Sequence, residues 1–473
     1  MFPKISKVTQ IRESVTTAFL YSAATDFSFP AISANAEKYA RGKLENESIC
    51  TVFTYPDFIF FYKHNTGVEP FLQAEAARKA GAVLAEQLKA GKVTEIQIDS
   101  SRISNMALPF IEGLLLTLYS FDKYKKEKEQ FGLKTIDVIC ESVSMQQIIE
   151  TENLVQAVFK ARDLVNEPLS FLTAVQLSAE FEKMGYEAGF SVEVFHKQKI
   201  EALKMGGLIA VNRGSIDPPT FTIMEWKPEQ HANSKPVVLA GKGVVFDTGG
   251  LSLKPTPKSM DYMKTDMAGA AVVASTIFAL AKNKVPLHVI GLVPATDNRP
   301  DGNAYVPGDI ITMFDGTTVE IKNTDAEGRL ILADALSYAK KFDPALVIDV
   351  ATLTGAADIV AGKYASLVMG NTPGDLVKLK ETGNETYERL IEVPLWEEYA
   401  EPLKSGIADL NNLGVREAQA TIAGKFLEHF TSYPWIHLDT AGTPFLDEKD
   451  HYRPAGGTGF GIRLLYNFLK KFN

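Results

Sequence analysis

The first third of the chain alternates runs of β-forming residues with longer amphipathic segments. The apolar positions predict, in order, a β-rich segment at residues 51–62, a helix at 71–92, a strand at 93–98, a helix at 108–124 and a strand at 133–140. Pro56 falls inside the first segment and predicts a turn or break there. This alternation predicts an N-terminal α/β domain over residues 1–145.

A long helix is predicted after this region. Ser144 and Gln147 have the spacing of a capping box, and the helix is expected to run to about Leu164. Asn166-Glu167-Pro168 ends it, because proline disfavours helical geometry in the residue before it. We therefore predict a linker helix at residues 146–168 and a C-terminal domain over residues 169–473.

The C-terminal region alternates more clearly between apolar strands and helices. The pattern predicts strands at residues 236–245, 287–293 and 345–350, and helices at 267–283 and 326–342. Nearly continuous apolar strands between helices are typical of a mostly parallel sheet that is buried on both faces. The expected fold class is α/β, with two α/β domains of which the C-terminal one is a mostly parallel sheet flanked by helices.

Charged residues interrupt this pattern where strands end and helices begin. Ligands of such sheets bind outside the carboxyl ends of the strands, so these positions are candidates for a site. The candidates are Lys242, Asp247, Asp266, Asp325 and Glu327. Each has a structural explanation when taken alone: Asp266 and Asp325 suit helix N-caps, and Glu327 suits the first turn of a helix.

Taken together, the four carboxylates and the lysines predict a metal centre. Converging carboxylates repel one another, and two divalent ions would balance their four negative charges. Oxygen ligands suit Mg²⁺, Mn²⁺ or Zn²⁺, and a neutral lysine amine favours zinc-like metals. Lysine ligates only when deprotonated, which a neighbouring dication would enforce. Lys254 and Arg329 then remain as cations that act on the substrate and the reagent.

Composition narrows the setting of this chemistry. The chain of 473 residues has a formal net charge of -9, which argues against a dedicated nucleic-acid binder. Its two cysteines form no CxxC pair, as suits a reducing compartment. The N-terminus has no apolar signal core, and the most apolar segment, at residues 267–281, is shorter than the ~20 residues of a membrane span. We expect a cytoplasmic protein that does not associate with membranes.

Several common catalytic motifs are absent from the sequence. It contains no HExxH, no GxxxxGK-Ser/Thr and no GxSxG, which removes thermolysin-like, P-loop and serine-hydrolase interpretations. Val244-Val-Phe-Asp-Thr-Gly249 resembles the active-site segment of aspartic proteases. Those enzymes need a second such segment, and Asp439-Thr-Ala-Gly442 misses the spacing. Another two-metal hydrolase, such as a phosphoesterase, is a further alternative. We interpret His437 and His451 as structural.

Spaced motifs in the C-terminal region resemble those of one known family, in the same order. They are Gly241-Lys-Gly243, Phe246-Asp-Thr-Gly-Gly250 with Lys254, Met263-Lys-Thr-Asp-Met-Ala-Gly-Ala270, Asn323-Thr-Asp-Ala-Glu-Gly-Arg-Leu330, Ala351-Thr-Leu-Thr-Gly-Ala356 and Thr458-Gly-Phe-Gly-Ile-Arg463. This set resembles the leucyl aminopeptidase family, the cytosol aminopeptidases, and the octapeptide at Asn323 matches the family signature. The N-terminal region matches only in general character. Thr248 departs from the serine of many relatives, which should not disturb metal ligation.

The resemblance implies a site for two divalent ions per subunit. Asp247 and Glu327 would bridge the two ions. Lys242 and Asp266 would complete the tighter site, and Asp325 the more exchangeable one. The expected ions are Zn²⁺ or Mn²⁺, with Mg²⁺ and Co²⁺ as further candidates.

The resemblance also implies the reaction and the residues that serve it. Lys254 would polarise the scissile carbonyl, and Arg329 would hold a bicarbonate that acts as general base. The implied activity is the release of N-terminal amino acids, leucine and other hydrophobic residues in particular, from short peptides by metal-activated water. The residues implied to line the substrate site are Met263, Asn323, Thr352, Leu353 and Gly355.

The family further implies an assembly and an alternative function. Its members form homohexamers whose active sites face an interior cavity, which limits access to short peptides. Some relatives also bind DNA, so a hexameric DNA-binding regulatory protein on the same fold is the alternative. The net charge of -9 gives that alternative no support.

Overall fold

The computed structural model describes residues 2–22, 30, 32–55, 57–128 and 131–472. The chain divides into two compact units, Met1–Val155 with Glu448–Pro454, and Gln156–Asp447 with Ala455–Asn473. The first dividing point lies within helix α4 (Met145–Asn166). Its predicted capping box is confirmed, because Ser144 N–H donates to Gln147 Oε1 at 2.9 Å and Gln147 N–H donates to Ser144 Oγ at 3.2 Å. The division into domains at 146–168 stays a prediction.

The first unit contains a six-stranded sheet in the order β1-β6-β5-β2-β4-β3, parallel except between β3 and β4. Its strands are β1 (Lys4–Lys7), β2 (Thr17–Ser22), β3 (Ile49–Phe53), β4 (Phe58–His64), β5 (Glu95–Asp99) and β6 (Thr135–Ile139). Its helices are α1 (Ala34–Asn46), α2 (Pro70–Ala90), the short η1 (Ser104–Met106) and α3 (Ala107–Thr117). The predicted break at Pro56 lies outside the described residues.

One helix of this unit is shorter than its pattern predicts. Helix α3 ends at Thr117, and residues 118–128 form a loop, whereas the sequence predicts helix to residue 124. The buried apolar residues of α3 end with Leu116. Beyond it Leu118, Tyr119 and Phe121 are only half-buried, and Tyr124 and the charged run 125–128 are exposed, so little packing supports further helix. Intrinsic helix propensity in this run is not enough to extend the helix.

The second unit contains a nine-stranded sheet whose centre is parallel. Strands β18, β14, β9, β11 and β10 are parallel neighbours, and antiparallel pairs join β11 to β8, β8 to β7 and β18 to β15. The strands are β7 (Ser191–His196), β8 (Thr220–Trp226), β9 (Val237–Gly241), β10 (Gly243–Asp247), β11 (Val289–Asn298), β14 (Leu346–Ala351), β15 (Ala365–Gly370), β16 (Arg389–Glu392) and β18 (Trp435–Asp439). The predicted α/β fold with a mostly parallel sheet is confirmed.

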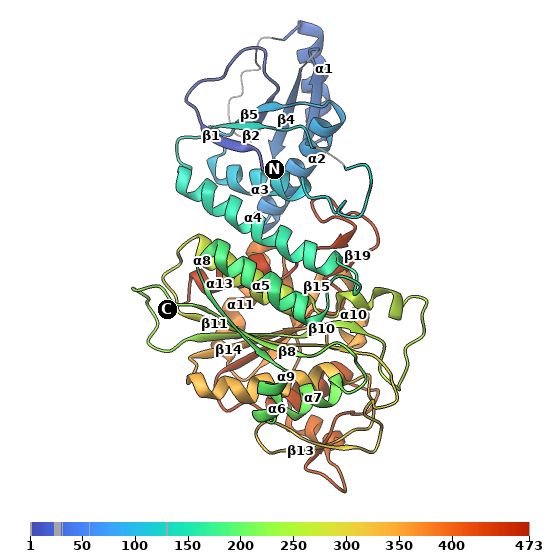
Figure 1. Cartoon of the computed structure of the whole chain (residues 1–473). Helices are drawn as coiled ribbons and strands as arrows, with labels where there is room; N and C mark the ends of the chain where they lie inside the picture. Colours follow the sequence, from blue (N-terminus) through green and yellow to red (C-terminus); the bar gives the residue numbers. More distant parts are fainter. Residues whose placement is uncertain (1, 23–29, 31, 56, 129–130, 473) are drawn as a thin grey trace. The chain divides into compact units, whose positions relative to one another are not determined.

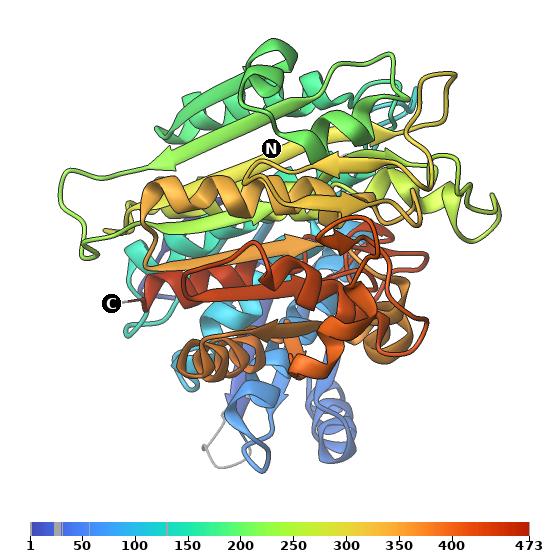
Figure 2. The ribbon, with the colours of Figure 1, turned by 90° about the horizontal axis from the view of Figure 1, so that it is seen from below.

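Helices cover both faces of this sheet (Figure 1). One face carries α5 (Ala174–Ala188), α8 (Ala268–Lys282), α11 (Pro373–Thr386) and α13 (Ile462–Lys470). The other carries α6 (Lys197–Ala202), α7 (Gly206–Asn212), α9 (Glu327–Ala339) and α12 (Gln419–Glu428), and Figure 2 shows α9 running along the strands. Strands β9, β11 and β14 are therefore fully buried, which accounts for their continuous apolar sequences.

Smaller elements complete the second unit. They are η2 (Met260–Thr265), β12 (Ile310–Thr312), β13 (Thr318–Glu320), η3 (Lys340–Phe342), α10 (Gly355–Ala361), η4 (Gly362–Tyr364), η5 (Glu397–Leu403), β17 (Leu410–Asn411), β19 (Phe445–Leu446) and β20 (Gly456–Gly457). The stretch Met260–Lys282 is long and apolar enough to cross a membrane by length and composition alone, but 89% of its apolar window is buried inside the fold. Its burial is that of a core helix.

Candidate metal centre and active site

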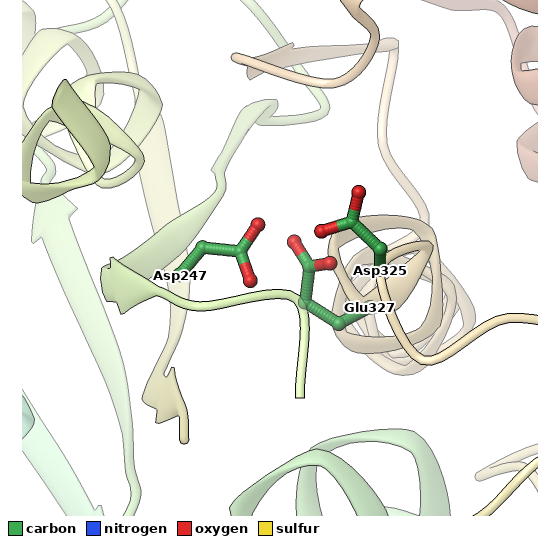
Figure 3. A group of neighbouring side chains, drawn as sticks. All are labelled: Asp247, Asp325 and Glu327. Carbon is green, nitrogen blue, oxygen red and sulfur yellow. The ribbon is translucent and has the colours of Figure 1, made fainter. Parts of the chain in front are cut away.

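Three carboxylates converge where β10 ends and α9 begins. Oxygen atoms of Asp247, Asp325 and Glu327 all lie within 4.8 Å of one another, and Figure 3 shows the three side chains pointing toward a common centre. Asp247 is the last residue of β10, where a register shift after Val244 marks a bulge in its pairing with β11. A bulge re-aims the side chains that follow it, which suits the presentation of Asp247 to the cluster.

The helix-cap explanation of these acids does not hold. Met267 occupies the N-cap of α8 and Ala326 that of α9, and neither helix has a side-chain cap. Asp266 and Asp325 each lie one residue before a cap, so they do not satisfy the first backbone N–H groups of the helices. Their carboxylates are available for another purpose.

Lys242, between β9 and β10, links this cluster to the fourth carboxylate. Its ammonium group lies 2.7 Å from Asp266 Oδ1 and 2.9 Å from Glu327 Oε1, and it donates to the Thr352 carbonyl at 2.9 Å. Thr352 Oγ1 also donates to Asp266 Oδ1 at 2.7 Å. Three acceptors thus surround the buried ammonium group, and Lys242 is held between Asp266 and Glu327.

Lys254 holds the corresponding position on the other side of the cluster. Its Nζ lies 2.9 Å from Asp247 Oδ2 and also forms an ion pair with Asp325. Its side chain is 15% exposed, compared with 3% for Lys242. Lys254 is therefore the lysine of this pair with more access to an approaching ligand.

Crowding of like charges shifts the pKa values of the acids. Burial, with the nearby Asp247 and Glu327 carboxylates, raises the pKa of Asp325 to about 7. Burial also raises the pKa of Asp266 well above its ordinary value. Burial opposes the charge of Glu327 as well, but the ammonium groups of Lys242 and Lys254 hold its pKa below the ordinary value. The site strongly favours cations near its carboxylates.

The donor set fits divalent metal ions. Within the part of the chain that the structure describes, the buried oxygens Asp266 Oδ2 and Glu327 Oε2 have no hydrogen-bond partner. An unpaired buried carboxylate oxygen is costly, and a metal ion would satisfy it. The carboxylates of Asp247, Asp325 and Glu327 line one place where such an ion would fit. Glu327 Oε1 also contacts Lys242 Nζ, which pairs with Asp266.

Arg329 lies on α9, two residues after Glu327. It is buried, and its Nε has no hydrogen-bond partner among the described residues. Its guanidinium carbon lies 5.9 Å from the centre of the Phe426 ring. Burial lowers the pKa of Arg329 to about 10, although Glu327 and Asp439 favour its charged form. A buried guanidinium with an unsatisfied donor is suited to hold a small anion.

The predicted substrate-lining residues surround the same edge of the sheet. Asn323 Oδ1 accepts from the Asp325 backbone N–H at 2.7 Å, and Thr352 bonds to Asp266 as described. Met263 accepts the Asp266 N–H through its carbonyl oxygen at 3.3 Å. Leu353 follows β14, and Gly355 opens α10. Asn323 and Thr352 thus contact the acids through their side chains and Met263 through its backbone.

Sequence reasoning missed two buried residues that support the site. Asn298 Nδ2 donates to Asp247 Oδ1 at 2.8 Å. Asp439 Oδ1 accepts from Leu353 N–H at 3.1 Å, and its Oδ2 accepts from Thr354 Oγ1 at 2.7 Å. Both residues end a strand, β11 and β18. The sequence pattern predicted the end of the first strand at residue 293 and no strand at 435–439, so the rule that selected Asp247 did not reach them. His437, interpreted as structural, lies fully buried with Nδ1 2.6 Å from Asp349 Oδ1.

Comparison with known proteins identifies the family of the chain. The catalytic-domain model of the cytosol aminopeptidase family matches residues 159–466, and the model of the family's N-terminal domain matches residues 65–128. The chain belongs to the cytosol aminopeptidase family. The predicted family is therefore confirmed, and the protein is a hydrolase that acts on peptides.

Individual members of the cytosol aminopeptidase family resemble the whole chain. A probable cytosol aminopeptidase of Chlorobium limicola is 43% identical over 423 residues, which cover 84% of this chain and 83% of the relative. The bottromycin maturation enzyme BotP in complex with Mn has a TM-score of 0.85 at 30% identity, covering 96% of this chain and 98% of that one. A point mutant of tomato leucine aminopeptidase has a TM-score of 0.87 at 25% identity, covering 99% and 97%.

Membership in the cytosol aminopeptidase family favours one of the functions predicted from sequence and leaves the DNA-binding alternative as a hypothesis. It supports a metal-dependent aminopeptidase. The aspartic protease alternative is wrong. Such an enzyme needs a second aspartate that shares a proton with the first, and Asp439 would have to share one with Asp247. Asp439 instead accepts hydrogen bonds from Leu353 and Thr354. The acidic cluster is therefore the candidate active site of a peptidase.

Proposed function

We propose that this protein is a two-metal aminopeptidase that releases N-terminal amino acids, leucine and other hydrophobic residues in particular, from short peptides. The observation that carries the proposal is the convergence of four carboxylates, three of them buried and Asp325 half-buried, with Lys242 and Lys254 at the carboxyl edge of the sheet. Divalent metal ions would balance the negative charge of these carboxylates. The family to which the chain belongs consists of aminopeptidases, for which such ions would serve the reaction.

In this proposal Asp247 and Glu327 would contribute to both divalent ions. Lys242 and Asp266 would help hold one ion, and Asp325 the other. When bound, two such ions supply a water nucleophile at neutral pH and a cationic anchor for the free amino group of the substrate. The candidate ions are Zn²⁺ and Mn²⁺, with Mg²⁺ and Co²⁺ also suited to the oxygen-rich part of the site. Cleavage next to a free amino group follows from that anchor.

The two remaining cations act on the reacting groups. Lys254, at the more open side of the cluster, stabilises negative charge that develops on the scissile carbonyl oxygen. Arg329 would hold a small anion such as bicarbonate, which could supply a general base when bound. Its buried guanidinium and its Nε, which lacks a partner among the described residues, support an anion there. Met263, Asn323, Thr352, Leu353 and Gly355 line the substrate site.

The setting of the reaction is proposed from the family as well. We infer a cytoplasmic homohexamer whose enclosed active sites admit short peptides, without a membrane or nucleic-acid partner. The relatives' names place them in the cytosol. Molecular mass in solution, measured by light scattering, tests the hexamer against the chain mass of 51.9 kDa.

The function is tested with leucine p-nitroanilide before and after chelation, with Mn²⁺ or Zn²⁺ added back. N-acetylated leucine p-nitroanilide controls for endopeptidase action, because it lacks the free amino group. Glu327→Gln removes a charge at the site with little change of shape, and Asp343→Asn is the matched control at an exposed position. We expect metal-dependent release from the free substrate by wild type and Asp343→Asn only.

Two outcomes would contradict the proposal. Undiminished activity in metal-free protein would remove the metals from the mechanism. Hydrolysis of the acetylated substrate at the same rate would show that no free amino group is needed. Absence of activity with every metal would favour the DNA-binding alternative, which an electrophoretic shift assay over a salt series then tests.

A further inference from the structure

Asn298 is a buried residue at the end of β11 whose side-chain amide donates hydrogen bonds to the two segments around the proposed metal site. It is 1% exposed. Its Nδ2 donates to Asp247 Oδ1 at 2.8 Å and to the Thr324 carbonyl oxygen at 3.0 Å. An amide NH₂ group has two donors, so both are used.

The backbone of Asn298 is bound to the same region. Its carbonyl oxygen accepts from Thr248 N–H at 3.0 Å and from Thr248 Oγ1 at 2.7 Å. Asn298 and Asp247 are also register partners in the β10–β11 pair. The amide is therefore held in place by a sheet pairing and by the residue that follows Asp247.

Thr324 belongs to the segment that leads into Asp325 and Glu327. Its carbonyl oxygen accepts from Asn298 and from Tyr305 Oη, the latter at 2.7 Å. Asn298 thus joins the two segments that provide the converging carboxylates, the end of β10 and the start of α9.

The contact also fixes which oxygen of Asp247 faces Lys254 and the cluster. Asp247 Oδ1 accepts from Asn298 Nδ2 and from Gly249 N–H, both at 2.8 Å. Asp247 Oδ2 is the atom that lies 2.9 Å from Lys254 Nζ, on the side of the cluster. Two donors on one oxygen orient the carboxylate and direct the other oxygen to the site.

Space around the amide leaves little room for rearrangement. A Cβ atom on Gly250 would lie 2.9 Å from Asn298 Oδ1, and Gly250 has a φ of +63°. Glycine at this position allows the turn and leaves room for the amide oxygen. The fold therefore keeps the Asn298 NH₂ group directed at Asp247 and Thr324.

We propose that Asn298 is a positioning residue that sets the metal affinity of the site by orienting Asp247 and joining its strand to the Asp325–Glu327 segment. This inference rests on the proposed function, because it assigns Asp247 to the metals. Partners of metal ligands typically change metal affinity about 10–100-fold when they are removed. The same factor is expected here.

The test is calorimetric titration of metal-stripped protein with Mn²⁺. Asn298→Ala removes both donors, and Asn298→Leu removes them while keeping most of the volume. Asn233→Ala is a matched control in the same unit. Asn233 is also a buried amide whose Nδ2 donates twice, to Lys235 and His288 carbonyl oxygens, but it lies beside the opposite end of β11.

We expect the Mn²⁺ dissociation constant of at least one position to rise about 10–100-fold in both Asn298 variants and to stay unchanged in Asn233→Ala. The thermal midpoint of metal-free protein should fall in all three variants, because each loses buried hydrogen bonds. A purely structural role would reproduce that fall without a change in affinity.

The other outcomes separate this inference from the proposed function. Unchanged Mn²⁺ affinity in both Asn298 variants would overturn the inference alone, and so would a change confined to Asn298→Ala, which would point to the cavity. Wild-type protein that binds no Mn²⁺ would overturn both. Wild-type protein that binds Mn²⁺ but releases no amino acid would overturn the proposed function, while the affinity comparison would still decide the role of Asn298.

Discussion

Lys254 touches two carboxylates of the cluster and still has an exposed side, so its role can be separated from that of the metal ligands. We expect Lys254→Ala to lower kcat about 10²–10³-fold, the typical cost of losing one donor to a developing oxyanion. Bound metal, measured by mass spectrometry, should remain. Lys258→Ala, in the same loop but fully exposed to solvent, is the control.

Glu327→Ala should differ from Lys254→Ala in the amount of metal that stays bound. Glu327 lies in the acidic triad and also contacts Lys242, so its removal affects both metal positions. We expect activity and bound metal to be lost together. Wild-type turnover by Lys254→Ala would show that the lysine has no part in the reaction.

At the residue scale, the charged candidate residues could be predicted from the sequence, whereas the neutral Asn298 could not. Asp247 at a strand end, and Asp266, Asp325 and Glu327 at helix starts, stand out because charged residues are rarely buried without a partner. Asn298 carries no charge, and an asparagine after a strand is an ordinary turn residue. Only its two hydrogen bonds, to residues far away in sequence, distinguish it.

At the scale of the elements, the position of the start of α8 depends on close contact between its backbone and the backbone of the sheet. A Cβ on Gly269 would lie 2.0 Å from the Val350 carbonyl oxygen and 3.0 Å from Lys242 N. These backbone atoms cannot move aside without shifting β14 or β9. Because Asp266 lies just before α8, Gly269→Ala should displace it and destabilise the protein by about 1–3 kcal/mol, the usual cost of overpacking.

The prediction for Gly269 is checked by thermal unfolding and by metal content, both of which should fall. Gly374→Ala is the matched control on α11, because a Cβ there would meet no atom within 4 Å. A Gly269→Ala protein with wild-type stability and metal content would show that α8 adjusts without moving Asp266.

Asp334 connects α9 to α7 and gives the second unit a pH-dependent stability. It is fully buried, and its two oxygens accept from Leu208 N–H and Phe314 N–H, each at 2.9 Å. Burial raises the pKa of Asp334 from 3.8 to about 7, although these backbone donors oppose the rise. Between pH 4 and pH 7 the folded chain therefore keeps a proton that the unfolded chain releases.

The sign of this effect follows from proton linkage. The contribution of Asp334 is fully present below the pKa of the unfolded state and is lost as the pH rises through the folded-state pKa, at up to about 1.4 kcal/mol per pH unit. We expect Asp334→Asn to remove this component, so that the wild type's advantage in thermal midpoint shrinks from pH 5 to pH 8. A difference between the two proteins that is the same at both pH values would contradict the assignment.

Element boundaries show where local pattern is insufficient. The central parallel strands were predictable because β9, β11 and β14 are apolar throughout. The antiparallel flank formed by β7 and β8 was not, since β7 alternates exposed and partly buried residues at the edge of the sheet and gives only a weak signal. Strand β11 extends to Asn298, beyond the predicted end at residue 293, because its pairing with β8 and β10 continues there.

For the whole molecule, the proposed metal site joins segments that are distant in the chain. Its proposed ligands come from Lys242 between β9 and β10, from the end of β10 and from the starts of α8 and α9, within residues 242–327 of one compact unit. The unfolded chain offers no comparable arrangement, so metal binding should favour the folded state. At a free ion concentration of 100 times the dissociation constant, the stabilisation is about 2.7 kcal/mol.

We therefore expect chelation to lower the thermal midpoint of the second unit by a few degrees, and Mn²⁺ or Zn²⁺ to restore it, as differential scanning calorimetry would record. Part of the loss reflects repulsion among four carboxylates, which only Lys242 and Lys254 then offset. Glu327→Ala should respond little to chelation, because it lacks a ligand of both positions. Two-unit proteins can unfold in more than one step. In that case the metal should shift only the transition of the unit that contains Asp247, since the first unit provides none of the proposed ligands. A shift of equal size in Glu327→Ala would place the stabilising ion outside this site.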